Sequence, residues 1–118
     1  FEDYYLSFKK QHKGEDWGFV PIKYAIEMWA MAMEKSKSTE AKAVAYALED
    51  MRYDGGMGEV WMRPGDHQIM EPIYVALFTE VGGKVKYDAD NSGYGWKTEV
   101  KISGDRVAQP HTCNMKRP

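Results

Sequence analysis

The chain has 118 residues and a formal net charge of −2, with 43% hydrophobic and 29% charged residues. A chain of this length buries roughly 65% of its unfolded surface, which is enough for one modest core. The charge balance excludes the basic stripe that nucleic-acid binding needs, and it offers no polybasic patch to a membrane surface. The longest apolar runs are far shorter than the ~20 residues of a spanning helix.

The sequence opens at Phe1, already within an amphipathic pattern. This opening favours part of a longer protein, and processing after a short leader is the alternative. The one cysteine, Cys113, cannot form an internal disulfide. It is therefore a free thiol, or its partner lies outside this chain.

Helical periodicity dominates the first third of the sequence. Aromatic residues recur at helical spacing from Phe1 to Phe8, which predicts a helix to about His12. A second helix is expected from Pro21 to about Lys35, because proline is tolerated in a first turn. Its predicted apolar face consists of Ile22, Ala25, Met28, Trp29, Ala32 and Met33, with Tyr24 beside it.

A third helix is expected to begin after a cap at Ser38 or Thr39 and to end before Gly55. Its apolar positions are expected to extend as far as Met51. The link before it is short, so the second and third helices are predicted to pack as a hairpin.

The second half of the sequence changes to strand-like patterns. Alternation at 59–62 predicts a short strand, and Pro64-Gly65 predicts a turn. The near-continuous apolar run at 73–81 predicts a strand buried on both faces. Further strands are expected at 85–87 and 96–102. Residues 88–95 are rich in Asp, Asn, Ser and Gly, which predicts a loop. An extended tail is expected at 109–118.

Several motifs occur together in a fixed order. Residues 54–60 read Asp-Gly-Gly-Met-Gly-Glu-Val, and residues 63–68 read Arg-Pro-Gly-Asp-His-Gln. They follow the helical segments 1–13 and 19–35, and the tail ends in Thr-Cys-Asn-Met-Lys-Arg-Pro at 112–118. This ordered set resembles the C-terminal part of the type I periplasmic solute-binding proteins. That family includes the branched-chain amino acid, or extracellular ligand-binding, receptors of ABC transporters.

The resemblance implies an α/β fold in which two lobes, each a parallel sheet flanked by helices, close over a ligand. This chain would be a fragment of that fold. Residues 1–62 would be a helical part of the N-terminal lobe, and residues 63–72 a hinge crossing. Residues 73–118 would supply strands of the C-terminal lobe and an extended tail.

The resemblance also implies site residues. Phe19 would face the ligand, with Trp17 and Tyr24 as further ligand-binding residues; the alternative is that Phe19 only staples the entry to its helix. Asp66, His67 and Gln68 would lie at the hinge between the lobes.

The residues favour neither a metal site nor catalysis. Asp66 and His67 are adjacent, so on a strand their side chains would point to opposite faces. The segment 88–95 lacks the calcium-loop spacing and is expected to be a solvated turn. No serine lies in a nucleophile-elbow context, and Cys113 lacks a dedicated base with an orienting group. We therefore expect no catalytic residues, no metal, no cofactor and no enzyme activity.

The resemblance implies the substrate-binding component of an ABC transporter. It would capture an amino acid or a related small carboxylate, including aromatic acids, in an interlobe cleft in the periplasm. Its expected partners are the small-molecule ligand, an ABC permease and the remaining N-terminal part of the same protein, but no nucleic acid. A leader peptide is expected outside this chain. One alternative is a stand-alone small α+β interaction domain without a small-molecule ligand, and another is a small hydrolase or metal enzyme.

Overall fold

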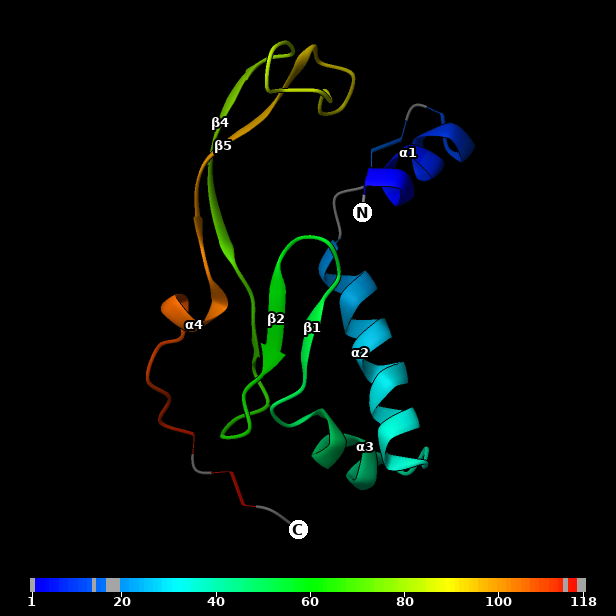
Figure 1. The fold of residues 1–118 in the computed structure, drawn as a ribbon, viewed down its shortest axis with the longest axis vertical. Helices are drawn as coiled ribbons and strands as arrows, with labels where there is room; N and C mark the ends of the chain where they lie inside the picture. Colours follow the sequence, from blue (N-terminus) through cyan, green and yellow to red (C-terminus); the bar gives the residue numbers. More distant parts are fainter. Residues whose placement is uncertain (1, 14, 17–19, 114, 117–118) are drawn as a thin grey trace. The chain divides into compact units, whose positions relative to one another are not determined.

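In the computed structural model, the described residues are 2–13, 15–16, 20–113 and 115–116. The chain divides into two compact units, which Figure 1 shows as ribbons. Unit 1 combines Phe1–Gly18 with Ile73–Ile102, and unit 2 combines Phe19–Pro72 with Ser103–Pro118. The expected ranges 1–62, 63–72 and 73–118 divide the chain differently, because the first helix groups with the long strands. The lobe to which each unit belongs stays a prediction.

Two helices form one side of unit 2. They are α2 (Val20–Ser36) and α3 (Ala41–Leu48), and they pack against each other as the predicted hairpin. The expected cap was wrong by one or two residues. Glu40 is the N-cap, because its Oε2 accepts the Ala43 N–H at 2.9 Å. Ser38 lies one step earlier, where its Oγ accepts the Glu40 N–H at 3.0 Å.

Helix α3 is shorter than predicted. It ends at Leu48, and Asp50 adopts a left-handed φ of 56°. The chain then turns into β1 (Arg52–Asp54), which the sequence did not predict. Met51 fits the helical period of α3 but lies past its end, and its carbonyl accepts the Met62 N–H at 3.1 Å. The sequence therefore predicts too late an end for this helix, because Met51 continues its apolar period.

The buried face of α2 is rotated from the predicted one. Tyr24, Met28 and Ala32 are buried at four-residue spacing. Ile22 and Trp29, which were expected on the apolar face, are 56% and 55% exposed. Helix α2 thus carries one apolar stripe inside unit 2 and a second one outside it. Such a helix is typical of a position covered on more than one side.

The sheet of unit 2 has the order β1–β2–β3, with β2 at Glu59–Met62 and β3 at Ile69–Met70. Its pairings are antiparallel. In the turn from β1 to β2, Asp54 Oδ1 accepts the N–H groups of Gly56 and Gly58 at 2.8 and 3.2 Å. Both glycines have left-handed φ angles, 98° and 106°, which glycine adopts without steric cost.

One hydrophobic core joins the helices to this sheet. Its buried members are Tyr24, Met28, Ala32, Val44, Ala47, Met51 and Val60. A short helix, α4 (Gly104–Val107), follows the long strands and contacts β2 and β3. The sequence did not predict α4. Gly104 packs on β3, since a Cβ there would lie 3.1 Å from the Met70 carbonyl oxygen.

Unit 1 consists of α1 (Glu2–Gln11) and a long antiparallel hairpin of β4 (Ile73–Glu80) and β5 (Tyr94–Ile102), drawn in Figure 1. The pairing shifts register between Val75 and Ala76. The expected strand at 85–87 was wrong, because an isolated bridge joins Gly82 to Val85 there. The predicted helix and the predicted strands at 73–81 and 96–102 are confirmed within about two residues.

The hairpin is apolar on both faces. Cross-strand partners share a face, and side chains alternate along each strand. The aliphatic face carries Ile73, Val75, Leu77 and Val100, and the aromatic face carries Tyr74, Phe78, Tyr94 and Trp96. The expectation that β4 is buried on both faces fails within this chain, since Leu77 is 57% exposed. A two-stranded sheet has no layer of its own to cover it.

Candidate functional site

Two of the three predicted ligand contacts, Phe19 and Trp17, lie outside the described residues. They directly precede α2 in the sequence.

Tyr24, the third predicted ligand residue, lies in the core of unit 2. Its side chain belongs to the buried cluster, and the residue is only 4% exposed. Its hydroxyl donates a hydrogen bond to the Glu71 carboxylate just after β3. Burial raises the pKa of the Tyr24 hydroxyl, and the bond to Glu71 raises it further. These contacts give Tyr24 a packing role.

A second tyrosine–carboxylate pair joins β1 to α2. The Tyr53 hydroxyl donates to Glu27 Oε2 at 2.8 Å, and Lys23 Nζ lies 2.5 Å from Glu27 Oε1. The hydrogen bond from Lys23 holds the pKa of Glu27 below its ordinary value. Gly55 packs between the two tyrosines, since a Cβ there would lie 3.3 Å from Tyr24 Cβ and 3.1 Å from Tyr53 Cε1.

Sequence reasoning missed Tyr53, Glu27 and Glu71. The i,i+4 spacing of Lys23 and Glu27 is a readable signal for their ion pair. The partners of the tyrosines depend on how the strands return to α2, which no local pattern encodes.

The predicted hinge motif is a tight turn between β2 and β3, within unit 2. Arg63 donates to both oxygens of Asp66, from Nε at 2.9 Å and from Nη2 at 2.6 Å. Asp66 Oδ1 also accepts the Gln68 N–H at 3.1 Å. The Arg63 guanidinium lowers the pKa of Asp66 from 3.8 to about 2. Asp66 is therefore an ionised structural partner of Arg63.

His67 has a partner outside the turn. Its Nε2 lies 2.8 Å from Glu49 Oε1 at the end of α3, and its φ is left-handed at 54°. The turn thus brings Asp66 and Gln68 into contact, whereas His67 contacts Glu49. A contact of these residues between lobes stays a prediction. Among the described residues, no group of three or more His, Cys, Asp or Glu side chains could hold a metal ion.

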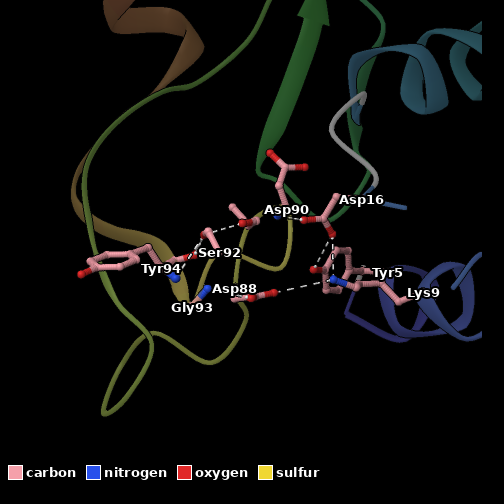
Figure 2. A network of polar contacts seen from close by, with 9 residues as sticks. Tyr5, Lys9, Asp16, Asp88, Asp90, Ser92, Gly93 and Tyr94 are labelled. Carbon is pink, nitrogen blue, oxygen red and sulfur yellow. Dashed lines mark hydrogen bonds and ion pairs between the residues drawn. The ribbon is translucent and has the colours of Figure 1, made fainter. Parts of the chain in front are cut away.

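The acidic loop after β4 is fastened to the segment after α1. Figure 2 shows Asp16 at the centre of this network. Asp16 accepts the Asp90 N–H at 2.5 Å and the Tyr5 hydroxyl at 3.2 Å, and it lies 2.9 Å from Lys9 Nζ. These contacts lower its pKa, with the Asp90 N–H as the largest cause. Asp88 accepts the Gly93 N–H at 3.0 Å, as in a tight turn. The loop is therefore a structural connection within unit 1.

The sequence and the fold both match a known family. The periplasmic binding protein family matches residues 9–83, which is more than half of the chain. The chain belongs to this family. Its members bind solutes and are not enzymes, which confirms the expected absence of catalysis.

Curated relatives include the Leu/Ile/Val-binding protein homolog 4 of Brucella abortus, Brucella suis and Brucella melitensis. Each is 31% identical over 101 residues, which are 80% of this chain and 24% of the relative. The chain thus spans about a quarter of the length of these relatives.

A solved structure has the same fold. The leucine-, isoleucine-, valine-, threonine- and alanine-binding protein from Brucella ovis, in a closed conformation, superposes with a TM-score of 0.83 at 24% identity. The match covers 99% of this chain and 31% of that protein. The expected fold, a fragment of a type I periplasmic binding protein, is confirmed. Among the described residues, no helix is long and apolar enough to cross a membrane.

Proposed function

We propose that this chain is part of the substrate-binding component of an ABC transporter. The whole protein captures an amino acid or a related small carboxylate in the periplasm and delivers it to a membrane permease. The family match over residues 9–83 carries this proposal. The names of the relatives favour branched-chain amino acids as the first ligands to test.

Exposed apolar surface supports the view that the chain needs the rest of such a protein. Trp96 and Leu77 of the hairpin are 64% and 57% exposed, and Ile26 of α2 is 59% exposed. Large apolar side chains exposed on both faces of one hairpin are typical of surface that another layer covers. Further layers of each lobe would cover it in the whole protein. The same surface argues against the stand-alone interaction domain, which would have to remain dispersed with both hairpin faces uncovered.

We infer that unit 1 belongs to the C-terminal lobe and unit 2 to the N-terminal lobe. The grouping of α1 with β4 and β5 supports this assignment, as does the grouping of the tail with α2 and α3. This assignment differs from the ranges expected from the sequence at two places. Helix α1 moves from the N-terminal to the C-terminal lobe, and the tail moves from the C-terminal to the N-terminal lobe. Among the described residues, the chain passes between the units at Pro72–Ile73 and at Ile102–Ser103.

We propose Phe19 and Trp17 as ligand contacts, because the family resemblance implies an aromatic ligand contact just before α2 in the sequence. An aromatic side chain there offers a large contact area with little entropy to lose. In the whole protein, Phe19→Ala is expected to weaken binding by about 1–3 kcal/mol. Unchanged affinity in calorimetric titration would remove Phe19 from the site. The contacts of Tyr24 favour packing, so its predicted ligand contact rests on the sequence alone.

The direct test of function is a thermal-shift screen of the whole protein with leucine, isoleucine, valine, other amino acids and aromatic acids. A ligand that binds only the folded state raises the melting temperature, by an amount that grows with its concentration. A shift with at least one small carboxylate is expected. If no carboxylate at millimolar concentration shifts the melting temperature, the proposed function is wrong.

A further inference from the structure

The turn from Arg63 to Gln68 holds the segment that follows α4. We call residues 109–113 the strap; they form neither helix nor strand and are exposed. The turn contacts the strap at Gln109 and at His111. Both contacts lie within unit 2.

The first contact uses the guanidinium of Arg63. Its Nη1 donates to the Gln109 carbonyl oxygen at 2.5 Å. The other nitrogens are engaged inside the turn, since Nε and Nη2 bind Asp66 and Nη2 also reaches Gln68 Oε1 at 3.0 Å. A two-point bond to a carboxylate fixes the plane of a guanidinium. Asp66 therefore aims Nη1 at the strap.

The second contact depends on the absence of a side chain. A Cβ on Gly65 would lie 2.4 Å from Nε2 and 2.5 Å from Cε1 of His111. The imidazole thus lies directly on the backbone of the turn. Any other residue at position 65 would displace the ring or the strap.

The turn is itself held on its other side. His67 Nε2 lies 2.8 Å from Glu49 Oε1 at the end of α3. The backbone closes the turn, since Arg63 N–H donates to the Gln68 carbonyl and His67 N–H donates to the Arg63 carbonyl, both at 2.9 Å. The turn thus connects the end of α3 to the strap.

We propose that this turn is a clasp, in which Arg63 and Gly65 hold the strap in one register and Asp66 positions Arg63. The strap then has a held state, with both contacts made, and a released state, with neither. Releasing it requires breaking the Arg63–Gln109 bond and lifting His111 off Gly65, and leaves the core of unit 2 untouched. The clasp is a conformational device within unit 2.

The single cysteine of the chain provides a probe at the strap. Cys113 is exposed and lies two residues beyond His111, so a nitroxide label there reports the mobility of the strap. In the full chain, Arg63→Gln and Gly65→Ala are each expected to raise the label's rotational rate at least about twofold. Arg52→Gln is the matched control, because Arg52 pairs with Glu59 and Asp105 in the same unit but does not contact the strap.

A double substitution distinguishes the clasp from general destabilisation. His111→Ala removes the ring that a new Cβ would meet. If the clasp is correct, Gly65→Ala adds no further mobility in the His111→Ala background, although it does so in the parent chain. Equal increments in both backgrounds, or a label rate unchanged by His111→Ala, would overturn the proposal. His111 is exposed, so this pair stays informative even if Arg63→Gln prevents folding.

Discussion

The interactions that stabilise unit 1 internally differ from those that stabilise unit 2. Unit 2 has a hydrophobic core that joins α2, α3 and β2. Among the described residues of unit 1, Val85 is the one buried hydrophobic side chain. Unit 1 depends instead on a cross-strand ladder and on a polar network around Asp16 (Figure 2).

The difference indicates which unit depends more for its stability on further layers of the whole protein. Buried apolar surface supplies most of the stability of a domain, whereas exposed ion pairs contribute little. Unit 2 has the elements of a partial domain with a core of its own. Unit 1 has a hairpin with strong apolar character whose side chains Leu77 and Trp96 are exposed, so unit 1 gains most from the rest of the protein.

The largest expected difference comes from matched apolar truncations. Met28→Ala removes a side chain that is 1% exposed and is expected to destabilise unit 2 by about 2–5 kcal/mol. Leu77→Ala in unit 1 is expected to cost about 0.5 kcal/mol or less in the isolated chain. Urea unfolding of both variants measures the difference. Equal losses would contradict the contrast between the units.

A medium effect is expected from the buried tyrosine. Tyr24→Phe removes the hydroxyl that binds Glu71 but keeps the ring in the core, and is expected to destabilise unit 2 by about 1 kcal/mol. Glu71→Gln keeps an acceptor oxygen, so a smaller loss is expected. Denaturant melts of the two single variants and the double variant give the coupling, and additive losses would show that the bond contributes nothing.

A smaller effect is expected in the polar network of unit 1. Asp16→Asn removes the charge that Lys9 and the Asp90 N–H share, and should destabilise unit 1 by about 1 kcal/mol or less. The loss should shrink at high salt because screening weakens exposed pairs. Asp90→Asn is the matched control, since Asp90 contributes its backbone N–H. Amide exchange at Asp90 measures both, and equal rates in the two variants would rule out the network.

The smallest expected effect is on how the stability of the fold depends on pH in acid. The pKa of Asp66 is lowered in the folded chain, so its carboxylate stabilises the fold above its ordinary pKa of 3.8, and this stabilisation is lost as the pH falls through about 2. Asp66→Asn is expected to remove that part of the acid dependence. Melting temperatures of both chains over this pH range provide the comparison. Parallel profiles would mean that the Arg63–Asp66 pair does not affect folding.

Much of the secondary structure could be predicted because local periodicity encodes it. Helices α1 and α2 and strands β2 and β5 follow patterns that are visible in the sequence. The end of α3 could not be found, since Met51 continues the helical period while Asp50 turns the chain without a glycine. Helix α4 is only one turn long, too short to show a period.

Burial was harder to predict than secondary structure. The apolar run in β4 correctly predicts a strand, but its exposure depends on layers that this chain does not supply. On α2, both apolar stripes satisfy the helical period, so the sequence could not tell which one faces α3. The partners of Tyr24, Arg63 and His67 depend on tertiary contacts between segments distant in sequence.

Hydrogen exchange of the hairpin tests the central claim, that this chain is a share of a larger binding protein, most directly. The measurement compares the amides of β4 and β5 in the isolated chain and in the whole protein under the same conditions. We expect these amides to exchange at least about tenfold more slowly in the whole protein, because other layers cover both faces of the hairpin. Equal protection in the two would show that unit 1 is complete by itself and would contradict the account.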